Sequence, residues 1–162
     1  MLLFDFQMKK EEKMEIEAFK VIGISVKTTN ENSESMGAIL ELWETFMKED
    51  IMSKIPNKSS MDIYSVYTDY EGDYMAPYTV ILGCRVTSLG EVPEGMVGKC
   101  IPGGKSAVYK AKGNLNEGIV FKAWQEIWNA DINRAYTTDY EVYGKKVKSP
   151  EDAEVDIFVA LK

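Results

Sequence analysis

Apolar residues along the chain follow two spacings, and these spacings alternate in a regular order. Between residues 36 and 49 the apolar positions lie three or four residues apart, at Ile39, Leu42, Trp43, Phe46 and Met47. This spacing is typical of a helix that buries one face, and residues 119–130 repeat it. The sequence therefore predicts two amphipathic helices, one in each half of the chain.

Stretches rich in β-branched and aromatic residues surround both helices and predict strands. They cover residues 18–29, 62–72, 78–88, 98–113, 137–144 and 154–162. The stretch 98–113 contains Pro102, Gly103 and Gly104, which predict an interruption of that strand. Each half of the chain is thus expected to contain a strand, a helix and two further strands, in that order.

The two halves also resemble each other residue by residue. With an offset of 81, Leu42–Ile51 aligns with Ala123–Ile132; with an offset of 76, Tyr64–Tyr67 aligns with Tyr140–Tyr143. Such a repeat predicts an α+β fold, a tandem βαββ pseudo-repeat whose units pair into one antiparallel sheet. Both helices are expected on one side of the sheet, with a ligand groove between the repeats.

The length of 162 residues suits one domain with a sizeable core. We expect residues 1–13 to be an N-terminal tail or leader and residues 14–162 to form the domain, with repeats at about 18–88 and about 97–162. No apolar run approaches the roughly 20 residues that cross a bilayer, and no signal sequence is evident. We therefore expect a cytoplasmic protein without a membrane partner.

The composition narrows the chemistry. The chain has no histidine, which removes histidine-dependent nucleophilic catalysis and imidazole metal sites, and its two cysteines, Cys84 and Cys100, are too few for a zinc site. We expect no metal, no cofactor and two free thiols. The formal net charge is −7 and no basic stripe is present, so direct DNA binding is not expected.

Glu141 is the residue that fits its surroundings least. It lies in a strand-like stretch, where alternation places it on one face with Asp139 and Tyr143. The repeat aligns Glu141 with Ser65, so the fold itself does not require a carboxylate at this position. Glu141 is then either a solvated surface residue or the polar anchor of a cavity, and a carboxylate among tyrosines favours the cavity.

Several stretches, taken together, resemble the GyrI-like family, also described as the bacterial transcription-activator effector-binding domain. These stretches are IEAFKVIGISVKTT, IYSVYTDYEGDYMAPYTVILGCRV, GGKSAVYKAKG, AWQEIWNAD, TDYEVYG and EVDIFVALK, and the resemblance covers roughly Met14 to Lys162. The resemblance implies a duplicated βαββ unit that binds lipophilic cationic or aromatic small molecules between its repeats. It also implies that Glu141, in the stretch Asp139 to Tyr143, lies at the floor of the pocket.

One stretch departs from the family pattern. The family often has Trp-Leu-Pro-x-Ser-Gly after the second helix, whereas this chain has WNADINRAY from Trp128 onward. We therefore expect the wall beside Glu141, and with it the ligand, to differ from those of other members.

The interpretation that we favour is a stand-alone small-molecule-binding domain that senses or sequesters its ligand. Aromatic side chains would surround a cation paired with the glutamate; the candidate ligand-binding residues are Glu141, Tyr143, Tyr64, Tyr67, Tyr109, Trp124 and Trp128. Core packing is the alternative for each aromatic residue, above all for Trp124, which the repeat matches to Trp43.

Two other functions stay open. GyrI-like relatives include hydrolases of electrophilic aromatic compounds, and Glu141 with Tyr143 would then be the catalytic pair. Other relatives bind a protein and inhibit DNA gyrase, which would give this chain a protein partner. An enzyme is the less favoured hypothesis, because one carboxylate would have to supply all the proton chemistry.

Overall fold

The computed structural model describes residues 7–31 and 34–162 of the chain. Its helices are α1 (Glu34–Lys48), α2 (Ile51–Lys54), the short 3₁₀ turn η2 (Leu115–Glu117) and α3 (Ile119–Trp128). Its strands are β1 (Gln7–Ile16), β2 (Phe19–Thr28), β3 (Ile63–Thr68), β4 (Tyr78–Val86), β5 (Val97–Ile101), β6 (Gly104–Gly113), β7 (Thr138–Tyr143), β8 (Val147–Ser149) and β9 (Asp152–Ala160). Both expected helices are present, at α1 and α3.

Within the described residues, all strands join one antiparallel sheet in the order β1-β6-β9-β7-β3-β4-β2-β5, with β8 added beside β9. The first unit, β2-α1-β3-β4, and the second, β6-α3-β7-β9, follow the same order along the chain. They meet at the centre of the sheet, where β3 pairs with β7 and Ser65 lies directly opposite Glu141. The predicted α+β class and the paired βαββ units are confirmed.

The N-terminal part of the chain differs from the expected tail. Residues 7–13 belong to β1, which pairs with β6 so that Met14 lies opposite Ser106. Residues 12–15 are exposed, and three of them, Glu12, Lys13 and Glu15, are charged. Charges on an edge strand protect that edge from pairing with other chains. Residues 1–6 of the expected tail lie outside the described residues.

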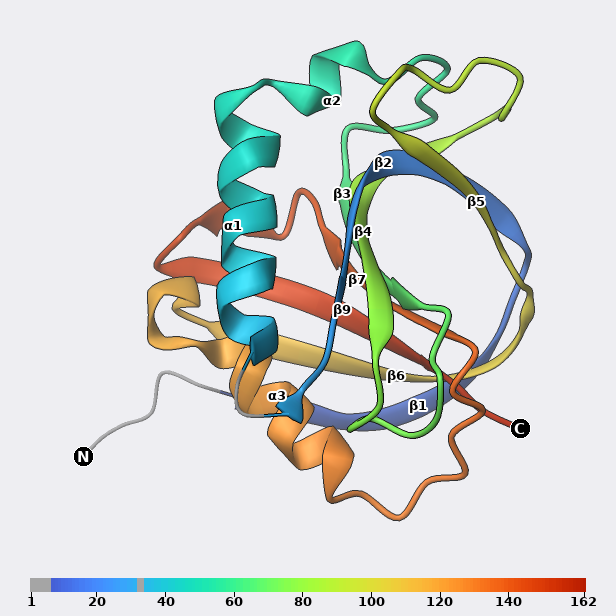
Figure 1. Ribbon diagram of the computed structural model, residues 1–162. Helices are drawn as coiled ribbons and strands as arrows, with labels where there is room; N and C mark the ends of the chain where they lie inside the picture. Colours follow the sequence, from blue (N-terminus) through green and yellow to red (C-terminus); the bar gives the residue numbers. More distant parts are fainter. Residues whose placement is uncertain (1–6, 32–33) are drawn as a thin grey trace.

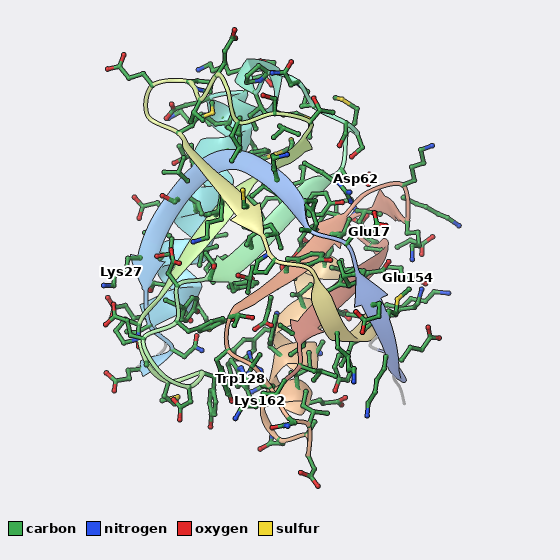
Figure 2. All side chains as sticks on the ribbon, turned by 90° about the vertical axis from the view of Figure 1, so that its right-hand side faces the viewer. Glu17, Lys27, Asp62, Trp128, Glu154 and Lys162 are labelled. Carbon is green, nitrogen blue, oxygen red and sulfur yellow. The ribbon has the colours of Figure 1, made fainter. Side chains whose placement is uncertain are left out.

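At the predicted interruption, Pro102 to Gly104, the chain bends, but its antiparallel pairing with the β1–β2 segment continues on both sides of the bend. Phe19 of β2 lies opposite Ile101 of β5, and three residues further along each strand Ile16 of β1 lies opposite Gly104 of β6. A side chain at Gly103 would come within 2.8 Å of the Ile16 carbonyl oxygen, so only glycine permits this approach. This antiparallel ribbon curls the sheet, and β2 arches from Lys27 towards Glu17, where it leads into β1 (Figures 1 and 2).

Two apolar clusters occupy the two faces of the curled sheet. The larger one lies under α1 and α3, which both cover the same face (Figure 1), and it contains Phe46, Leu82, Ile127 and Ile157. The smaller one lies on the opposite face and contains Phe19, Val21, Tyr64, Val66, Ile81, Ile101 and Tyr140. The sheet is therefore buried on both faces along its centre, where β3 and β7 meet.

Two further expectations concern single features. Cys84 is buried and Cys100 is exposed, and both are free thiols, as predicted. In the part of the chain that the structure describes, no helix is long and apolar enough to cross a membrane.

Candidate functional site

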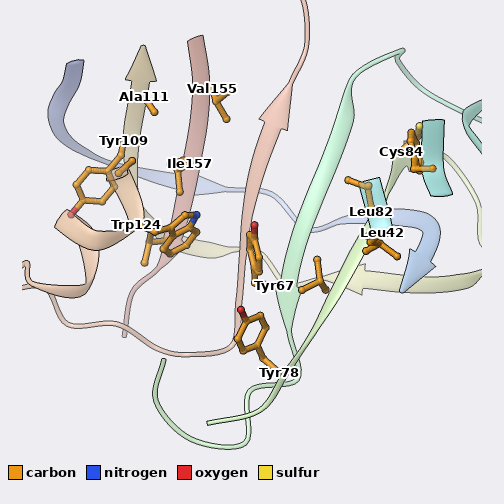
Figure 3. Close-up of a cluster of buried hydrophobic side chains, with 14 of the residues drawn as sticks. Leu42, Tyr67, Tyr78, Leu82, Cys84, Tyr109, Ala111, Trp124, Val155 and Ile157 are labelled. Atoms are coloured by element: carbon orange, nitrogen blue, oxygen red, sulfur yellow. The ribbon is translucent and has the colours of Figure 1, made fainter. Parts of the chain in front are cut away.

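A cavity of about 380 Å³ lies between the two helices and the centre of the sheet. Residues of α1, α3, β3, β7 and the β3–β4 loop line it, so both repeats contribute to its wall. Its aromatic lining residues are Trp43, Tyr67, Tyr70, Tyr74, Tyr78, Phe121, Trp124, Trp128 and Tyr143. Figure 3 shows three of these side chains, Tyr67, Tyr78 and Trp124, gathered at the junction of the repeats. The predicted groove between the repeats is thus an aromatic cavity.

Glu141 lies on the floor of this cavity and is only 1% exposed. Its Oε2 accepts hydrogen bonds from the Tyr67 hydroxyl and from the Trp124 indole Nε1, both at 2.6 Å. Its Oε1 accepts a hydrogen bond from the Tyr143 hydroxyl, also at 2.6 Å. The carboxylate is therefore held rigidly by three neutral donors from β3, α3 and β7.

Among the described residues, none forms an ion pair with Glu141. Burial raises the pKa of Glu141 above its usual range, although the hydrogen bonds from Tyr143, Tyr67 and Trp124 lower it in part. Burial and the neighbouring carboxylate also raise the pKa of Tyr67 and that of Tyr143 well above the usual tyrosine value. Both tyrosines are therefore protonated donors at any physiological pH.

Asp139 is a second buried carboxylate, and unlike Glu141 it forms an ion pair. Its Oδ2 accepts hydrogen bonds from Arg134 Nη2 at 2.8 Å and from the Tyr70 hydroxyl at 2.7 Å. Its Oδ1 accepts a hydrogen bond from the Ala160 amide at 2.7 Å. Burial raises the pKa of Asp139, although Arg134 lowers it in part; burial alone would lower the pKa of Arg134, but the Asp139 carboxylate raises it. The two side chains form a buried ion pair at 2.8 Å that carries no net charge.

The stretch after α3, where the sequence departs from the family pattern, forms one wall of the cavity. Trp128 stacks on Tyr74 with ring centroids 5.3 Å apart, which connects α3 to the β3–β4 loop. Arg134 lines the cavity, and its guanidinium lies 4.3 Å from the centroid of the Tyr136 ring. Tyr136 has a φ of 54°, a conformation that a bulky residue adopts only when its surroundings hold it.

The structure brings together five of the seven residues that the sequence suggested for the site. Glu141, Tyr143, Tyr67, Trp124 and Trp128 all line the cavity.

The structure does not place Tyr64 or Tyr109 in the cavity lining. Tyr64 is an odd number of positions from Tyr67 along β3 and therefore faces the other side of the sheet, where it packs against Phe19 and Tyr140. Tyr109 is buried in the core, and Figure 3 shows it on the far side of Trp124 from Tyr67. Alternation along β3 would have excluded Tyr64 from the sequence alone.

Several lining residues were not suggested by the sequence. Trp43 lies half-buried on α1 and contacts Tyr143 edge-to-face with centroids 4.8 Å apart, so it packs and lines the cavity at once. Tyr70, Tyr74 and Tyr78 come from the β3–β4 loop and its ends. The density of tyrosine in this loop was the available signal, since a solvent-exposed turn rarely needs so many aromatic residues.

No group of side chains within residues 7–31 and 34–162 could hold a metal ion. The cavity lining includes two charged residues, Glu141 and Arg134, both buried. The cavity therefore combines a buried carboxylate with aromatic faces, which are the two features that attract organic cations.

Comparison with known proteins identifies relatives of this chain. The family described as Cass2, integron-associated effector binding protein, matches residues 14–161. The chain belongs to this family. The YobU protein of Bacillus subtilis (strain 168), which is named as a candidate transcriptional regulator, is 31% identical over 146 residues, covering 86% of this chain and 90% of YobU. The resemblance to effector-binding domains of transcription regulators is thereby confirmed.

Solved structures share the same fold. The integron cassette protein VCH_CASS2 from Vibrio cholerae superposes with a TM-score of 0.76 and is 32% identical, over 98% of this chain and 100% of that one. The structure of SAV2435 bound to tetraphenylphosphonium also has a TM-score of 0.76, over 95% of this chain and 94% of that one, but is 13% identical. The second comparison establishes a common fold between the two chains.

Proposed function

We propose that this chain is a small-molecule-binding domain that senses or sequesters a lipophilic organic monocation. The cavity would hold the cation, with Glu141 as its charge partner. The observation that carries the proposal is the buried Glu141 carboxylate, which has three neutral hydrogen-bond donors and no ion pair among the described residues. A buried charge without a partner costs several kcal/mol, and an incoming cation supplies that partner.

The charges around the cavity support a ligand with one positive charge. Arg134 and Asp139 cancel each other, so Glu141 remains as the single uncompensated charge among the described lining residues. A dication would leave one charge unpaired in an apolar cavity, at a cost comparable to the benefit of the first pairing. A neutral aromatic molecule would leave Glu141 as costly as before.

The hydrogen bonds at Glu141 support a cation that has few or no N–H donors. A carboxylate has about four acceptor sites, and the protein already fills three of them. A primary ammonium carries three donors and would lose water without gaining enough partners. Quaternary ammonium and phosphonium ions have no such donors, and the aromatic rings around the cavity attract them through cation–π contacts.

The family relationship supports a role in binding an effector molecule. SAV2435, a protein of the same fold, has been solved with tetraphenylphosphonium, which is a lipophilic monocation without hydrogen-bond donors. This cation is therefore a suitable first probe for the present chain.

The test uses intrinsic fluorescence, because all three tryptophans of the chain line the cavity. Titration with tetraphenylphosphonium should quench or shift the emission and saturate, whereas triphenylmethanol, a neutral aromatic molecule, should bind much more weakly. Mass analysis of the ligand after incubation should recover it intact. Turnover of an electrophilic aromatic compound that is lost in Glu141→Gln, but not in the surface variant Glu44→Gln, would instead establish a hydrolase.

A further inference from the structure

The mouth of the cavity is apolar on both sides. Four of the lining residues are exposed, and all four lack a polar side chain: Met36 and Leu40 on α1, and Gly118 and Phe121 at the start of α3. Exposed rims of pockets usually carry polar residues, because exposed apolar surface is unfavourable unless it is used. The rim of this cavity therefore has the character of a contact surface.

The apolar surface continues from the mouth along α1. Met36, Leu40, Trp43 and Met47 follow each other at the spacing of one helix face. Leu40 is 61% exposed, and Met47, which the spacing assigned to the buried face, is 65% exposed, so neither belongs to the core beneath the helix. From Met36 to Met47 the row extends for about 17 Å, at the rise of an α-helix. The first three members line the cavity and Met47 lies beyond it, so the surface leads outward from the binding site.

From this continuity we infer that the ligand is a cationic amphiphile, a molecule whose charged head lies at Glu141 and whose apolar tail leaves through the mouth and lies along the α1 row. This inference rests on the proposed function, since the head is placed by the carboxylate. The occupant of the α1 row is then part of the ligand. A compact cation fills the cavity but leaves the row in contact with water.

The test uses butyl-, octyl- and dodecyltrimethylammonium, which share one head and differ in tail length, at concentrations below micelle formation. For the unaltered protein, isothermal titration calorimetry should show affinity rising by about twofold to fourfold for each methylene that contacts the protein, fourfold corresponding to full burial. The affinity should stop rising once the tail is longer than the row.

Leu40→Gln and Met47→Gln test the row directly, because glutamine keeps the helix propensity and removes the apolar surface. Met47→Gln should lower the affinity for dodecyltrimethylammonium on the order of fivefold and leave that for butyltrimethylammonium within about twofold, because Met47 does not line the cavity. Leu40→Gln, whose side chain also lines the cavity, should lower the affinity for the long tail more than that for the short one. Met61→Gln is the matched control, because Met61 is 68% exposed and does not line the cavity. Urea denaturation of all three variants checks that the fold is unchanged.

The outcomes separate this inference from the function on which it rests. If neither tetraphenylphosphonium nor any alkyltrimethylammonium binds, the proposed function is wrong. If tetraphenylphosphonium binds but affinity does not increase with tail length, the inference alone is overturned. It is also overturned if the α1 variants affect short and long tails equally, or if Met61→Gln has the same effect as Met47→Gln.

Discussion

Replacement of Glu141 by glutamine separates the contribution of its charge from that of its shape. Glutamine can accept from Tyr67 and Trp124 through its single carbonyl oxygen, while its amide group can donate to the Tyr143 hydroxyl. The packing of the cavity floor is thus preserved, and the variant imitates a Glu141 that is permanently protonated. We expect this change to weaken ligand binding and to stabilise the free protein.

The magnitude of the binding loss follows from the contact that is lost. A charge-assisted contact contributes about 1–3 kcal/mol, so the affinity for tetraphenylphosphonium should fall by roughly 5-fold to 150-fold in Glu141→Gln at pH 8. A neutral aromatic ligand should lose much less. Equal losses for both ligands would show that Glu141 is not a charge partner.

The stability change has the opposite sign. The pKa of Glu141 is raised in the folded protein, so between the ordinary glutamate value and the raised value the folded state binds more protons than the unfolded state. The stabilisation from protonated Glu141 is therefore present at low pH and is lost as pH rises through this window, by up to about 1.4 kcal/mol per pH unit. Glu141→Gln lacks this loss and should be more stable than the parent at pH 8.

Ligand binding provides a second measure of the same proton. A quaternary cation binds the ionised carboxylate, so its affinity should rise with pH across the same window and become constant above it, by at most tenfold per unit. The groups that face Glu141 are Tyr67 on β3, Tyr143 on β7 and Trp124 on α3, and none of them titrates in that range. Urea denaturation and calorimetry at pH 5 and pH 8 measure both effects. A Glu141→Gln variant that is less stable than the parent at pH 8 would refute this account.

Three further predictions concern the neighbours of Glu141. Arg134→Met should lower the free energy of unfolding by about 3–5 kcal/mol in urea denaturation, because Asp139 loses its buried partner; a change below 1 kcal/mol would mean that the pair is not buried in solution. Tyr143→Phe removes a hydrogen bond that lowers the pKa of Glu141, so calorimetry should place the pH midpoint of cation binding higher; an unchanged midpoint contradicts the contact. Tyr64→Phe should leave cation affinity within about twofold by fluorescence titration, because Tyr64 faces the other side of the sheet, and a larger loss would contradict that placement.

The internal repeat explains why the centre of the site could be predicted from the sequence. Two copies of one unit that pair edge to edge through equivalent antiparallel strands are related by a pseudo-two-fold axis. Only the residue on that axis lies opposite its own equivalent. Tyr64 pairs with Val142 and Val66 pairs with Tyr140, while Ser65 pairs with its own equivalent, Glu141. Aligning the repeats therefore identified both the position of the carboxylate and its neutral counterpart.

The remaining parts of the site depend on features that a single sequence does not reveal. The charged residues of β1 resembled a tail, because the pattern of an exposed edge strand lacks apolar alternation. Arg134 reaches Asp139 across a loop that holds Tyr136 at positive φ, and no local propensity predicts such a turn. Tyr74 reaches Trp128 from another loop, and contacts between loops depend on the assembled fold.

The position of Glu141 also predicts how many cations one chain binds. A perfectly symmetric duplicate would place identical side chains on either side of the β3–β7 pair, with two carboxylates or none at its centre. Two carboxylates facing each other would share a proton rather than ionise together. Because Ser65 occupies the first-repeat position, Glu141 is the one carboxylate among the described lining residues, and one chain should bind one monocation. Ser65→Glu should then raise the apparent pKa of the site and weaken cation binding at pH 6 rather than create a second site. Calorimetry showing two cations per chain for this variant would contradict the view that the repeats share a single charge.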